Sequence, residues 1–566
     1  MHLRRKDWLD LLTIAGFCAF FFCYSLGAFG LTGADEPRYA QIAREMLQRQ
    51  DFITPHLYGR PWLEKPVLYY WLAAFFYQIL GVSDSAARLP SAFVSTLMVF
   101  AIYFHARRFR PGAELNAALM TLSCAGVIGF SRSASTDMPL AAFFVIGMLA
   151  WYTWFAGAQR LWLSVFYVAM ALGTLAKGPV APALAGLIII VFAIRERDLK
   201  IVWRTLWVPG ILLFLAVALP WFIAVQVRVP QFFREFFLEH NLERFAVTNL
   251  YHRRQPFWYY IPVLLLAVAP WSVYFVAGLV EHLRHFRDRA PGTAAHDPLP
   301  RFLVLWIVIF VAFFSISRSK LPGYILPAIP PCTILVADWL QRRGDKPDRL
   351  WRTALHAAVV ALLTVAAILA PFLIAARRAG QPPVLPPQLK VFAAVIAILV
   401  LAGVFLTIAR RGLEMLRFVT LAPIFLAVAW LLRAGGPVLD AAISARPVAR
   451  QIVDITGGEA PLAVYAPGHH VTGESSNREI QYGLAFYLDL PIARYDREEV
   501  PAADHLVVGR QGAEHDIAGA VAPRRVSRIG EFTPQRLELF WISPPPPPHV
   551  EEPTQSGPAP EHHHHH

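Results

Sequence analysis

WLDLLTIAGFCAFFFCYSLGAFGLTGADEPRYA, residues 8–40, joins an apolar run directly to the charged stretch Asp35-Glu36-Pro37-Arg38. About 20 apolar residues suffice to cross the hydrocarbon core of a bilayer as a helix. Ionisable side chains at the edge of that core are costly to hold, and they usually belong to a functional site. The stretch therefore predicts a membrane-spanning helix that leads into a polar site.

The apolar pattern recurs along the whole chain. Of its 566 residues 56% are hydrophobic and 16% are charged, against about 25% charged in ordinary soluble domains. We predict a polytopic α-helical membrane protein with about 13 spans, at 8–28, 88–106, 113–131, 138–157, 160–176, 178–194, 203–225, 256–280, 301–317, 322–340, 352–375, 388–409 and 414–433. Residues 66–81 are too few for a span and are expected to lie along the membrane interface.

The basic residues indicate how the chain is oriented. The formal net charge of +13 arises largely at the ends of apolar runs, as in membrane proteins, and this placement argues against a nucleic-acid partner. With the N-terminus in the cytoplasm, the basic loops at 107–110, 195–197, 284–289, 342–343 and 410–411 all face inward, as the positive-inside rule requires. A span at 66–81 would reverse every later loop, so we place the charged stretch after residue 34 on the external side.

The chain divides into three parts. Residues 1–433 form the predicted membrane domain, and 434–543 form a small external α/β domain with strands near 462–465, 506–508 and 537–541 and a helix around 480–488. Residues 544–566 are predicted to be a disordered proline-rich tail with an expression tag. The four cysteines have no pairing or metal-type spacing and are interpreted as small core residues.

Two short helices are expected on the external membrane surface. Asp35 is predicted to cap the first, with an apolar face formed by Tyr39, Ile42, Ala43, Met46 and Leu47. The alternative is that Asp35 serves only as that cap, but the adjacent Glu36 and Arg38 favour a functional role. The second helix follows Glu64-Lys65-Pro66 and carries three predicted headgroup anchors, Tyr69, Tyr70 and Trp71.

Cations gather on the external side, against the expected bias. Eight that lie at external span ends or in external loops are Lys65, Arg132, Lys177, Arg244, Arg253, Arg254, Arg318 and Lys320. Two cations at the start of one helix, Arg318 and Lys320, are electrostatically unfavourable unless an anion lies between them. The loops also contain a third acidic residue, Asp137, which alternatively caps the fourth span together with Thr136. We interpret the set as an anion-binding site.

Metal binding is a weaker alternative. Glu64 and His240 both lie in external loops and could meet around a divalent ion such as zinc, but no local ligand spacing supports this. No cofactor is expected to be required.

Taken in order, five motifs resemble those of the aminoarabinose transferases of Gram-negative bacteria. They are Asp35-Glu36-Pro37-Arg38-Tyr39, Trp62-Leu63-Glu64-Lys65-Pro66, Ser135-Thr136-Asp137-Met138-Pro139, Lys177-Gly178-Pro179 and Arg318-Ser319-Lys320-Leu321-Pro322-Gly323-Tyr324. That family belongs to the GT-C class of membrane glycosyltransferases, related to protein O-mannosyltransferases. The resemblance implies transfer of 4-amino-4-deoxy-L-arabinose from undecaprenyl phosphate to lipid A phosphates, on the periplasmic face of the inner membrane, with resistance to polymyxin-type peptides.

The resemblance also assigns expected roles. Asp35 lies at the reacting centre, together with Asp137. Lys65, Arg244 and Tyr324 hold the donor phosphate, with Arg318 and Lys320 nearby. The other polar residues of these loops are expected to bind substrate, namely Glu36, Arg38, Tyr39, Arg132 and Lys177.

The chemistry of a phosphate acceptor limits what Asp35 must do. The second ionisation of a phosphomonoester lies at about 6, so the acceptor barely needs a base. A single in-line displacement, which inverts the anomeric centre, is expected without a covalent intermediate. Three alternatives stay open: a protein O-mannosyltransferase-like enzyme with a hydroxyl acceptor, a lipid transporter or flippase, and an external binding module anchored by the spans.

Overall fold

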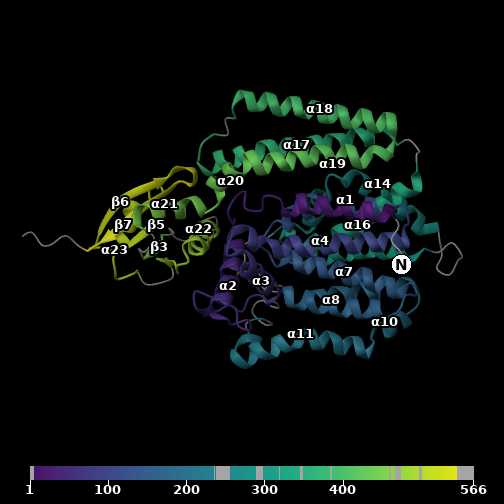
Figure 1. The fold of residues 1–566 in the computed structure, drawn as a ribbon, viewed down its shortest axis with the longest axis horizontal. Coiled ribbons are helices and arrows are strands. Elements are labelled where there is room, and N and C mark those ends of the chain that lie inside the picture. The colour runs from purple at the N-terminus through teal and green to yellow at the C-terminus, as the bar shows by residue number, and fades with distance from the viewer. Residues whose placement is uncertain are drawn as a thin grey trace, which may run out of the picture.

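The protein is a bundle of long helices with an α/β domain at one end (Figure 1). This computed structural model describes residues 5–234, 236, 255–288, 297–317, 319–344, 348–382, 385–457, 461–465, 473–495 and 500–544. The predicted tail at 544–566 lies almost entirely outside the described residues.

All thirteen predicted spans coincide with helical segments. Their bounds are α1 (Arg5–Cys18) with the π-helical turn Ala19–Cys23, α4 (Asp84–Phe109), α5 (Glu114–Leu122), α6 (Ala125–Ser131), α7 (Asp137–Phe155), α8 (Leu161–Lys177), α9 (Val180–Arg195), α11 (Val208–Arg228), α13 (Tyr260–Val268), α14 (Ser272–Asp288), α15 (Pro298–Ile316), α16 (Ile329–Arg343), α17 (Leu350–Arg378), α18 (Pro387–Arg411) and α19 (Leu416–Trp430). A short helix, α10 (Lys200–Thr205), joins α9 to α11.

The count of thirteen spans is not confirmed. Within the described residues eight helices are long and apolar enough to cross a membrane, or up to ten if each of two bent pairs is one span. The pairs are α5 with α6, bent by 61°, and Phe257–Val268 with Ser272–Arg284, bent by 117°. Helices α8 and α9 have 17 and 16 residues, short of the roughly 20 that a perpendicular crossing needs. The protein is a multi-pass membrane protein.

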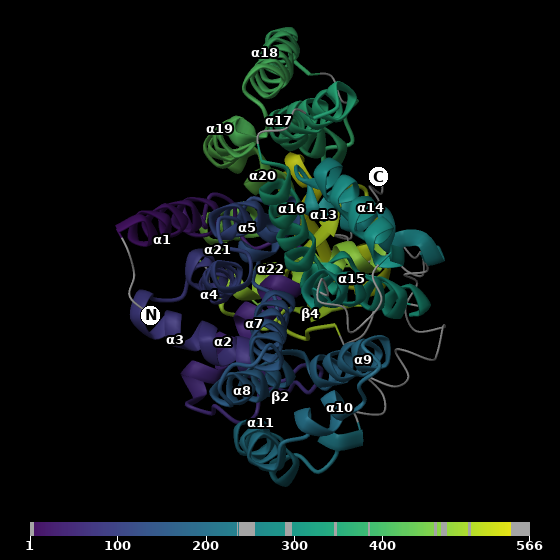
Figure 2. The same ribbon diagram turned by 90° about the vertical axis from the view of Figure 1, so that its right-hand side faces the viewer.

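The two ends of the bundle differ in the way the sequence predicts. The predicted cytoplasmic loops meet at one end, where Arg107 bonds Asp7 at 2.7 Å and Arg110 bonds Asp297 at 2.6 Å. The α/β domain lies at the opposite end, beside α2 (Asp35–Arg49) and α3 (Leu68–Leu80) (Figure 1). Helices α17, α18 and α19 form a separate group along one side, which is clearest when the bundle is seen end-on (Figure 2).

Helix α2 differs from its prediction in two respects. Ala34, not Asp35, precedes its first turn, and no side chain caps it. Most of its apolar face, including Ile42 and Met46, is buried against protein, and Leu47 is partly buried. An amphipathic pattern shows which face of a helix is apolar, but it does not show whether lipid or protein covers that face.

Helix α3 is confirmed as too short to span, but two of its predicted headgroup anchors are core residues. Tyr69 and Tyr70 are fully buried, and the Tyr69 hydroxyl donates to the carbonyl of Ala87 at 2.7 Å. The opposite edge of α3 exposes Phe75 and Ile79, which is the apolar surface that an interfacial helix presents to lipid.

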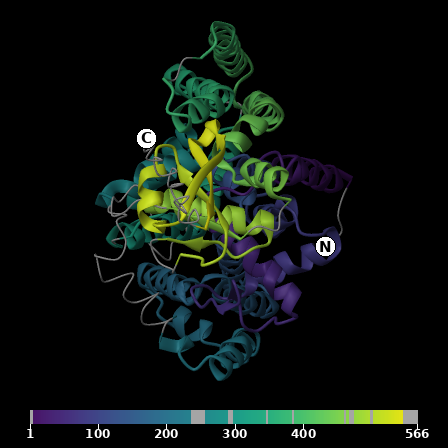
Figure 3. The same cartoon turned by 90° about the vertical axis from the view of Figure 1, so that its left-hand side faces the viewer.

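The C-terminal domain has the predicted α/β character. Its five-stranded sheet has the order β4-β3-β5-β7-β6, with β4-β3-β5 parallel and β5-β7-β6 antiparallel. The elements are α21 (Arg446–Thr456), β3 (Leu462–Val464), α22 (Gly473–Leu488), β4 (Ala493–Arg494), β5 (His505–Arg510), α23 (Glu514–Val521), β6 (Arg525–Phe532) and β7 (Leu537–Ser543). Figure 3 shows this domain in front of the bundle. The last membrane helix runs past residue 433, through α20 (Gly436–Ile443), before the domain begins.

The C-terminal domain is bonded directly to the first external loop. The Tyr487 hydroxyl donates to Asp84 at 2.6 Å and accepts from the amide of Leu31 at 2.7 Å, while Arg446 bonds Asp84 at 2.8 Å. The domain therefore covers the end of the bundle where the predicted motifs lie.

All four cysteines are free, and three are buried as predicted, but Cys23 is exposed.

Candidate active site

Glu36 fixes the start of α2 against the bundle. Its carboxylate is buried and accepts from Arg88 of α4 at 2.8 and 3.2 Å, from the amide of Thr32 at 2.8 Å and from the amide of Ala134 at 2.7 Å. Burial raises the pKa of Glu36, but the charge and hydrogen bonds of Arg88 outweigh it and hold the pKa below its usual value. Glu36, predicted to bind substrate, thus has partners within the protein that account for both oxygens.

Asp35, the next residue along, faces outward. Its side chain is 57% exposed and accepts from Arg38 at 2.6 Å. Arg38 also lies 3.9 Å from Glu64, which is half-buried. Two carboxylates therefore share one guanidinium, and the Asp35 carboxylate keeps an open side from which it can contact a substrate.

Aromatic side chains hold Arg38 in place. Its guanidinium lies 4.9 Å from the ring centre of Trp62, 5.2 Å from that of Tyr39 and 5.6 Å from that of Tyr482 in α22. Burial alone lowers the pKa of Arg38, but Tyr39, Asp35 and Glu64 raise it above its usual value, so the residue stays charged. Arg38 is therefore a fixed cation that positions the two carboxylates.

Tyr39 lies between two groups of acidic residues. Burial raises its pKa, and so do the charges of Asp35, Glu64 and Asp137. The hydroxyl is therefore a neutral phenol near neutral pH and can donate a hydrogen bond. The charges of both Asp35 and Asp137 act on Tyr39. Tyr39 therefore lies between the first external loop and the loop that precedes α7.

Asp137 begins α7 and forms an ion pair with Lys177 at the end of α8. The Ser135 hydroxyl donates to the other carboxylate oxygen of Asp137 at 3.2 Å. The ammonium of Lys177 also lies 4.5 Å from the ring centre of Tyr324. Three of the predicted motifs, which are far apart in the sequence, thus meet around Asp137.

Gly323 lets the segment that contains Tyr324 approach this pair closely. A Cβ atom at Gly323 would lie 2.9 Å from the Asp137 carboxylate and 2.9 Å from the Phe130 ring, closer than real contacts allow. The Lys320 ammonium, predicted to bind an anion, donates to the carbonyl of Ser317 in its own loop. Burial lowers the pKa of Lys320.

Several other predicted residues lie elsewhere. Arg132, predicted to bind an anion, instead donates to the backbone carbonyls of Phe21 and Ser25 at 3.1 and 2.9 Å. Lys65 is half-buried between β2 (Arg60–Pro61) and α3. Five predicted residues, His240, Arg244, Arg253, Arg254 and Arg318, lie outside the described residues.

The metal prediction is tested only in part. Among the residues that the structure describes, no three His, Cys, Asp or Glu side chains gather as a metal site would require. Glu64 has Arg38 as a neighbour, and its proposed partner His240 is not described. The zinc alternative therefore stays a prediction.

Sequence patterns indicate neither Arg88 nor Tyr482 as a residue of this site, although Arg88 bonds Glu36 and Tyr482 lies against Arg38. Arg88 begins the second predicted span as a lone charge in an apolar helix, which is a weak signal that a buried partner exists. Nothing in the sequence around Tyr482 places it beside Arg38.

A protein-family model matches part of the chain. Residues 64–223, which include Glu64, Asp137 and Lys177, match the model described as dolichyl-phosphate-mannose-protein mannosyltransferase.

Curated relatives match a longer region. The chain is 34% identical over 356 residues to an undecaprenyl phosphate-alpha-4-amino-4-deoxy-L-arabinose arabinosyl transferase of Pseudomonas paraeruginosa, which covers 61% of this chain and 62% of that relative. The protein of the same name from Serratia proteamaculans is 33% identical over 351 residues, covering 60% of each. The matched region thus spans about three fifths of these relatives.

The whole fold has a counterpart among solved structures. A crystal structure of ArnT from Cupriavidus metallidurans bound to undecaprenyl phosphate superposes with a TM-score of 0.75 at 23% identity, covering 95% of this chain and 98% of that one. Its apo form gives a TM-score of 0.73 with the same coverage. The chain therefore shares the fold of that membrane protein, including the C-terminal domain.

Proposed function

We propose that this protein is a glycosyltransferase that moves 4-amino-4-deoxy-L-arabinose from undecaprenyl phosphate to phosphate groups of lipid A, at the periplasmic face of the inner membrane. One observation carries the proposal. Asp35, with its open carboxylate, lies at the same end of the bundle as the Asp137–Lys177 pair, although these residues come from separate parts of the chain. The names of the matched relatives and the shared fold support this donor and this sugar.

The carboxylates suit an amino sugar. Asp35 and Glu64 share the single guanidinium of Arg38. Two carboxylates beside one guanidinium leave an excess negative charge, which attracts a further cation. The ammonium group of 4-amino-4-deoxy-L-arabinose supplies that cation. Asp35 then orients the sugar and stabilises the positive charge that develops at the anomeric carbon.

The cations suit the departing lipid phosphate. Lys177 lies at the end of α8, beside Asp137 and Tyr324, and Lys65 lies at the start of α3. As the bond between the sugar and the donor phosphate breaks, negative charge grows on that phosphate, and ammonium groups stabilise it. Tyr39 adds a neutral hydroxyl that can donate to a sugar or phosphate oxygen.

An acceptor phosphate attacks the anomeric carbon from the side opposite the leaving phosphate. The acceptor oxygen is already anionic near neutral pH, so no proton has to be abstracted. One displacement transfers the sugar with inversion, and undecaprenyl phosphate is released. Asp35 and Asp137 act in this proposal as charge-stabilising and positioning groups.

A second candidate is a protein mannosyltransferase-like activity, which the matched family model favours. A serine or threonine acceptor would need a general base, and Asp35 is the exposed carboxylate that could serve. The two candidates differ in the product that cells accumulate.

Mass spectrometry of lipid A tests the choice. Lipid A from Gram-negative cells that express the protein is expected to carry an added pentosamine, and lipid A from cells without it, or with the Asp35→Asn variant, is not. Unchanged lipid A together with newly glycosylated periplasmic protein would favour the second candidate and refute the first.

A further inference from the structure

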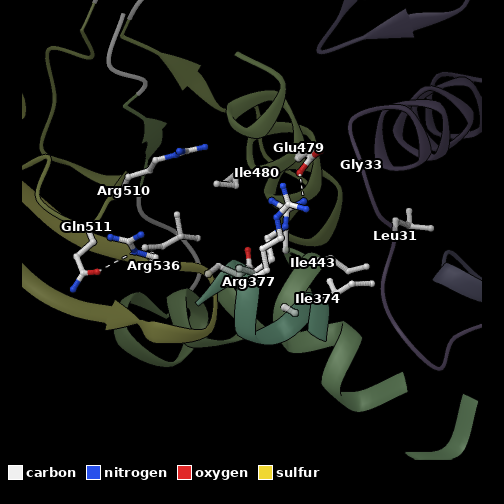
Figure 4. A pocket seen from close by; sticks show the side chains of 15 residues that line it. Leu31, Gly33, Ile374, Arg377, Ile443, Glu479, Ile480, Arg510, Gln511 and Arg536 are labelled. Atoms are coloured by element: carbon white, nitrogen blue, oxygen red, sulfur yellow. Dashed lines mark hydrogen bonds and ion pairs between the residues drawn. The ribbon is translucent and has the colours of Figure 1, made fainter. Parts of the chain in front are cut away.

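A second charged site lies where the C-terminal domain meets the membrane helices. A cavity of about 740 Å³ is lined by the end of α17, the end of α20, the segment around Leu31 and Gly33, and residues of α22, β5 and β7 (Figure 4). It is distinct from the Asp137–Lys177 cluster, whose residues do not line it. Gly33 at its rim is two residues from Asp35.

The cavity is strongly basic. Four arginines line it, Arg377, Arg378, Arg510 and Arg536, against one carboxylate, Glu479, so its lining carries a net charge of +3. Arg378 bonds Glu479 at 3.3 Å and Arg536 lies 3.4 Å from the Gln511 side-chain oxygen. Within the described part of the chain, neither Arg377 nor Arg510 has a carboxylate partner. A concave surface with excess guanidinium groups attracts an anion.

The backbone holds one of these arginines in place. Gly380, just after α17, has φ of +67°, and a Cβ atom there would lie 2.8 Å from a terminal nitrogen of Arg536. Arg536 itself has φ of +56°, a backbone conformation that costs energy in a residue with a side chain. The guanidinium of Arg536 therefore packs directly over the Gly380 backbone.

The position of Arg377 and Arg378 is also unusual for a membrane helix. They end α17 at the same end of the bundle as the C-terminal domain, the end opposite the basic loops that the positive-inside rule explains. The positive-inside rule therefore does not explain why two arginines end α17 here. Ile374, Ile443 and Leu31 give the same cavity an apolar part, so a ligand with both a phosphate and a lipid or sugar body would fit its chemistry.

We propose that this cavity binds a second phosphate group of the acceptor lipid, while the first phosphate lies at the Asp35 end of the site. The inference rests on the proposed function, because it assumes an acceptor that carries phosphate. It deepens that function by assigning the substrate class: a lipid with two phosphomonoester groups binds both sites and is preferred over one with a single group.

Binding to the full-length protein in nanodiscs tests the proposal. The probes are bisphosphorylated lipid A, monophosphorylated lipid A and inorganic phosphate. The wild-type protein is expected to bind the bisphosphorylated lipid at least about tenfold more tightly, since charge-assisted hydrogen bonds contribute on this scale. The Arg377→Ala/Arg510→Ala variant is expected to bind both lipids within about twofold of each other, because the second phosphate then loses its free cations.

A matched control separates this effect from a general loss of positive charge. Arg450→Ala/Arg525→Ala removes two exposed arginines of the same domain that do not line the cavity, and it is expected to keep the wild-type preference. Equal binding of the two lipids by the wild type, or an unchanged preference in the cavity variant, would overturn the proposal. So would displacement of the bisphosphorylated lipid by millimolar inorganic phosphate, which would indicate a site for the free ion.

The outcome is separable from that of the proposed function. If the wild type prefers the bisphosphorylated lipid but transfers no sugar, the cavity assignment holds and the proposed reaction fails. If transfer occurs normally in the Arg377→Ala/Arg510→Ala variant with no change in preference between the two acceptors, the reaction holds and the cavity assignment fails.

Discussion

Replacing Glu36 by glutamine keeps the shape of the side chain and removes its charge. Each carboxylate oxygen of Glu36 accepts hydrogen bonds from two residues. One oxygen accepts from Thr32 and Arg88, and the other accepts from Arg88 and Ala134. A glutamine has only one acceptor oxygen, so its NH₂ group must face a donor on one side or the other. Arg88, which is 1% exposed, also loses its counter-charge.

The size of the effect follows from these contacts. Breaking a buried ion pair from one side costs about 3–5 kcal/mol. Arg88 keeps its hydrogen bonds to the carbonyls of Leu26, Phe29 and Gly30, at 2.8, 2.8 and 2.9 Å, which places the expected loss near the lower end. We predict that Glu36→Gln lowers the free energy of unfolding by about 3 kcal/mol.

The assay is SDS titration of the purified protein in mixed micelles, followed by helical circular dichroism. Asp35→Asn is the matched control, because it neutralises the neighbouring carboxylate, which is exposed, and should change stability by no more than about 0.5 kcal/mol. A Glu36→Gln loss below about 1 kcal/mol would refute the view that this residue is the anchor of α2.

Four further substitutions test the site and the docking of the domain. Asp137→Asn and Lys177→Met are each expected to lower transfer about 100-fold, and the double variant no further, because the residues act as one pair; additive losses in kcat/KM would contradict this. Gly323→Ala is expected to lower transfer by about 100-fold, since the new Cβ must displace the Asp137 carboxylate, and unchanged kcat/KM would exclude that displacement. Although burial raises the pKa of Asp489, Arg44 and neighbouring glutamines hold it below 3.8, so its stabilisation is full above about pH 4 and is lost as the pH falls through the lowered value. Asp489→Asn should therefore lower the thermal stability near neutral pH, and its difference from the wild type should shrink below about pH 4; a difference independent of pH would contradict the assignment.

The substitutions that test transfer have internal controls. Gly186→Ala adds a methyl group to α9 where nothing lies within 4 Å of the new Cβ, so it should leave transfer unchanged. The side chains of Lys177 and Asp137 are only 15% and 19% exposed, so the Asp137→Asn and Lys177→Met variants are each expected to unfold at a lower temperature than the wild type. Transfer is therefore compared at a temperature at which circular dichroism shows every variant folded. A variant that fails to fold would be replaced by the more conservative Asp137→Glu or Lys177→Arg.

Much of the architecture could be predicted because span length and charge bias act locally. Thirteen apolar segments are all helical, and the loops predicted on one side do meet at one end. The number of crossings could not be predicted, because α8 and α9 are near the length limit and two other segments bend sharply. Hydropathy does not distinguish a broken helix from a straight one.

Sequence motifs select candidate residues, but they do not predict which of those residues contact one another. Motif order led to Asp35, Asp137 and Lys177, and the structure brings the last two into an ion pair. The burial of Glu36 depends on how α2 packs against Arg88, which lies 52 residues away, and no local pattern contains that information. The cap predicted for Asp35 is wrong for a related reason: residue type favours a cap there, but the fold has it bond Arg38 instead.

Transfer by the purified protein tests the central claim most directly. Wild-type protein, undecaprenyl phosphate-linked aminoarabinose and lipid A are combined in micelles, and the lipid products are resolved by mass spectrometry. Pentosamine-modified lipid A is expected with the wild type and none with Asp35→Asn, whose helical content and SDS stability are expected to stay those of the wild type. Full transfer by Asp35→Asn, or no transfer by a folded wild type supplied with both lipids, would contradict it.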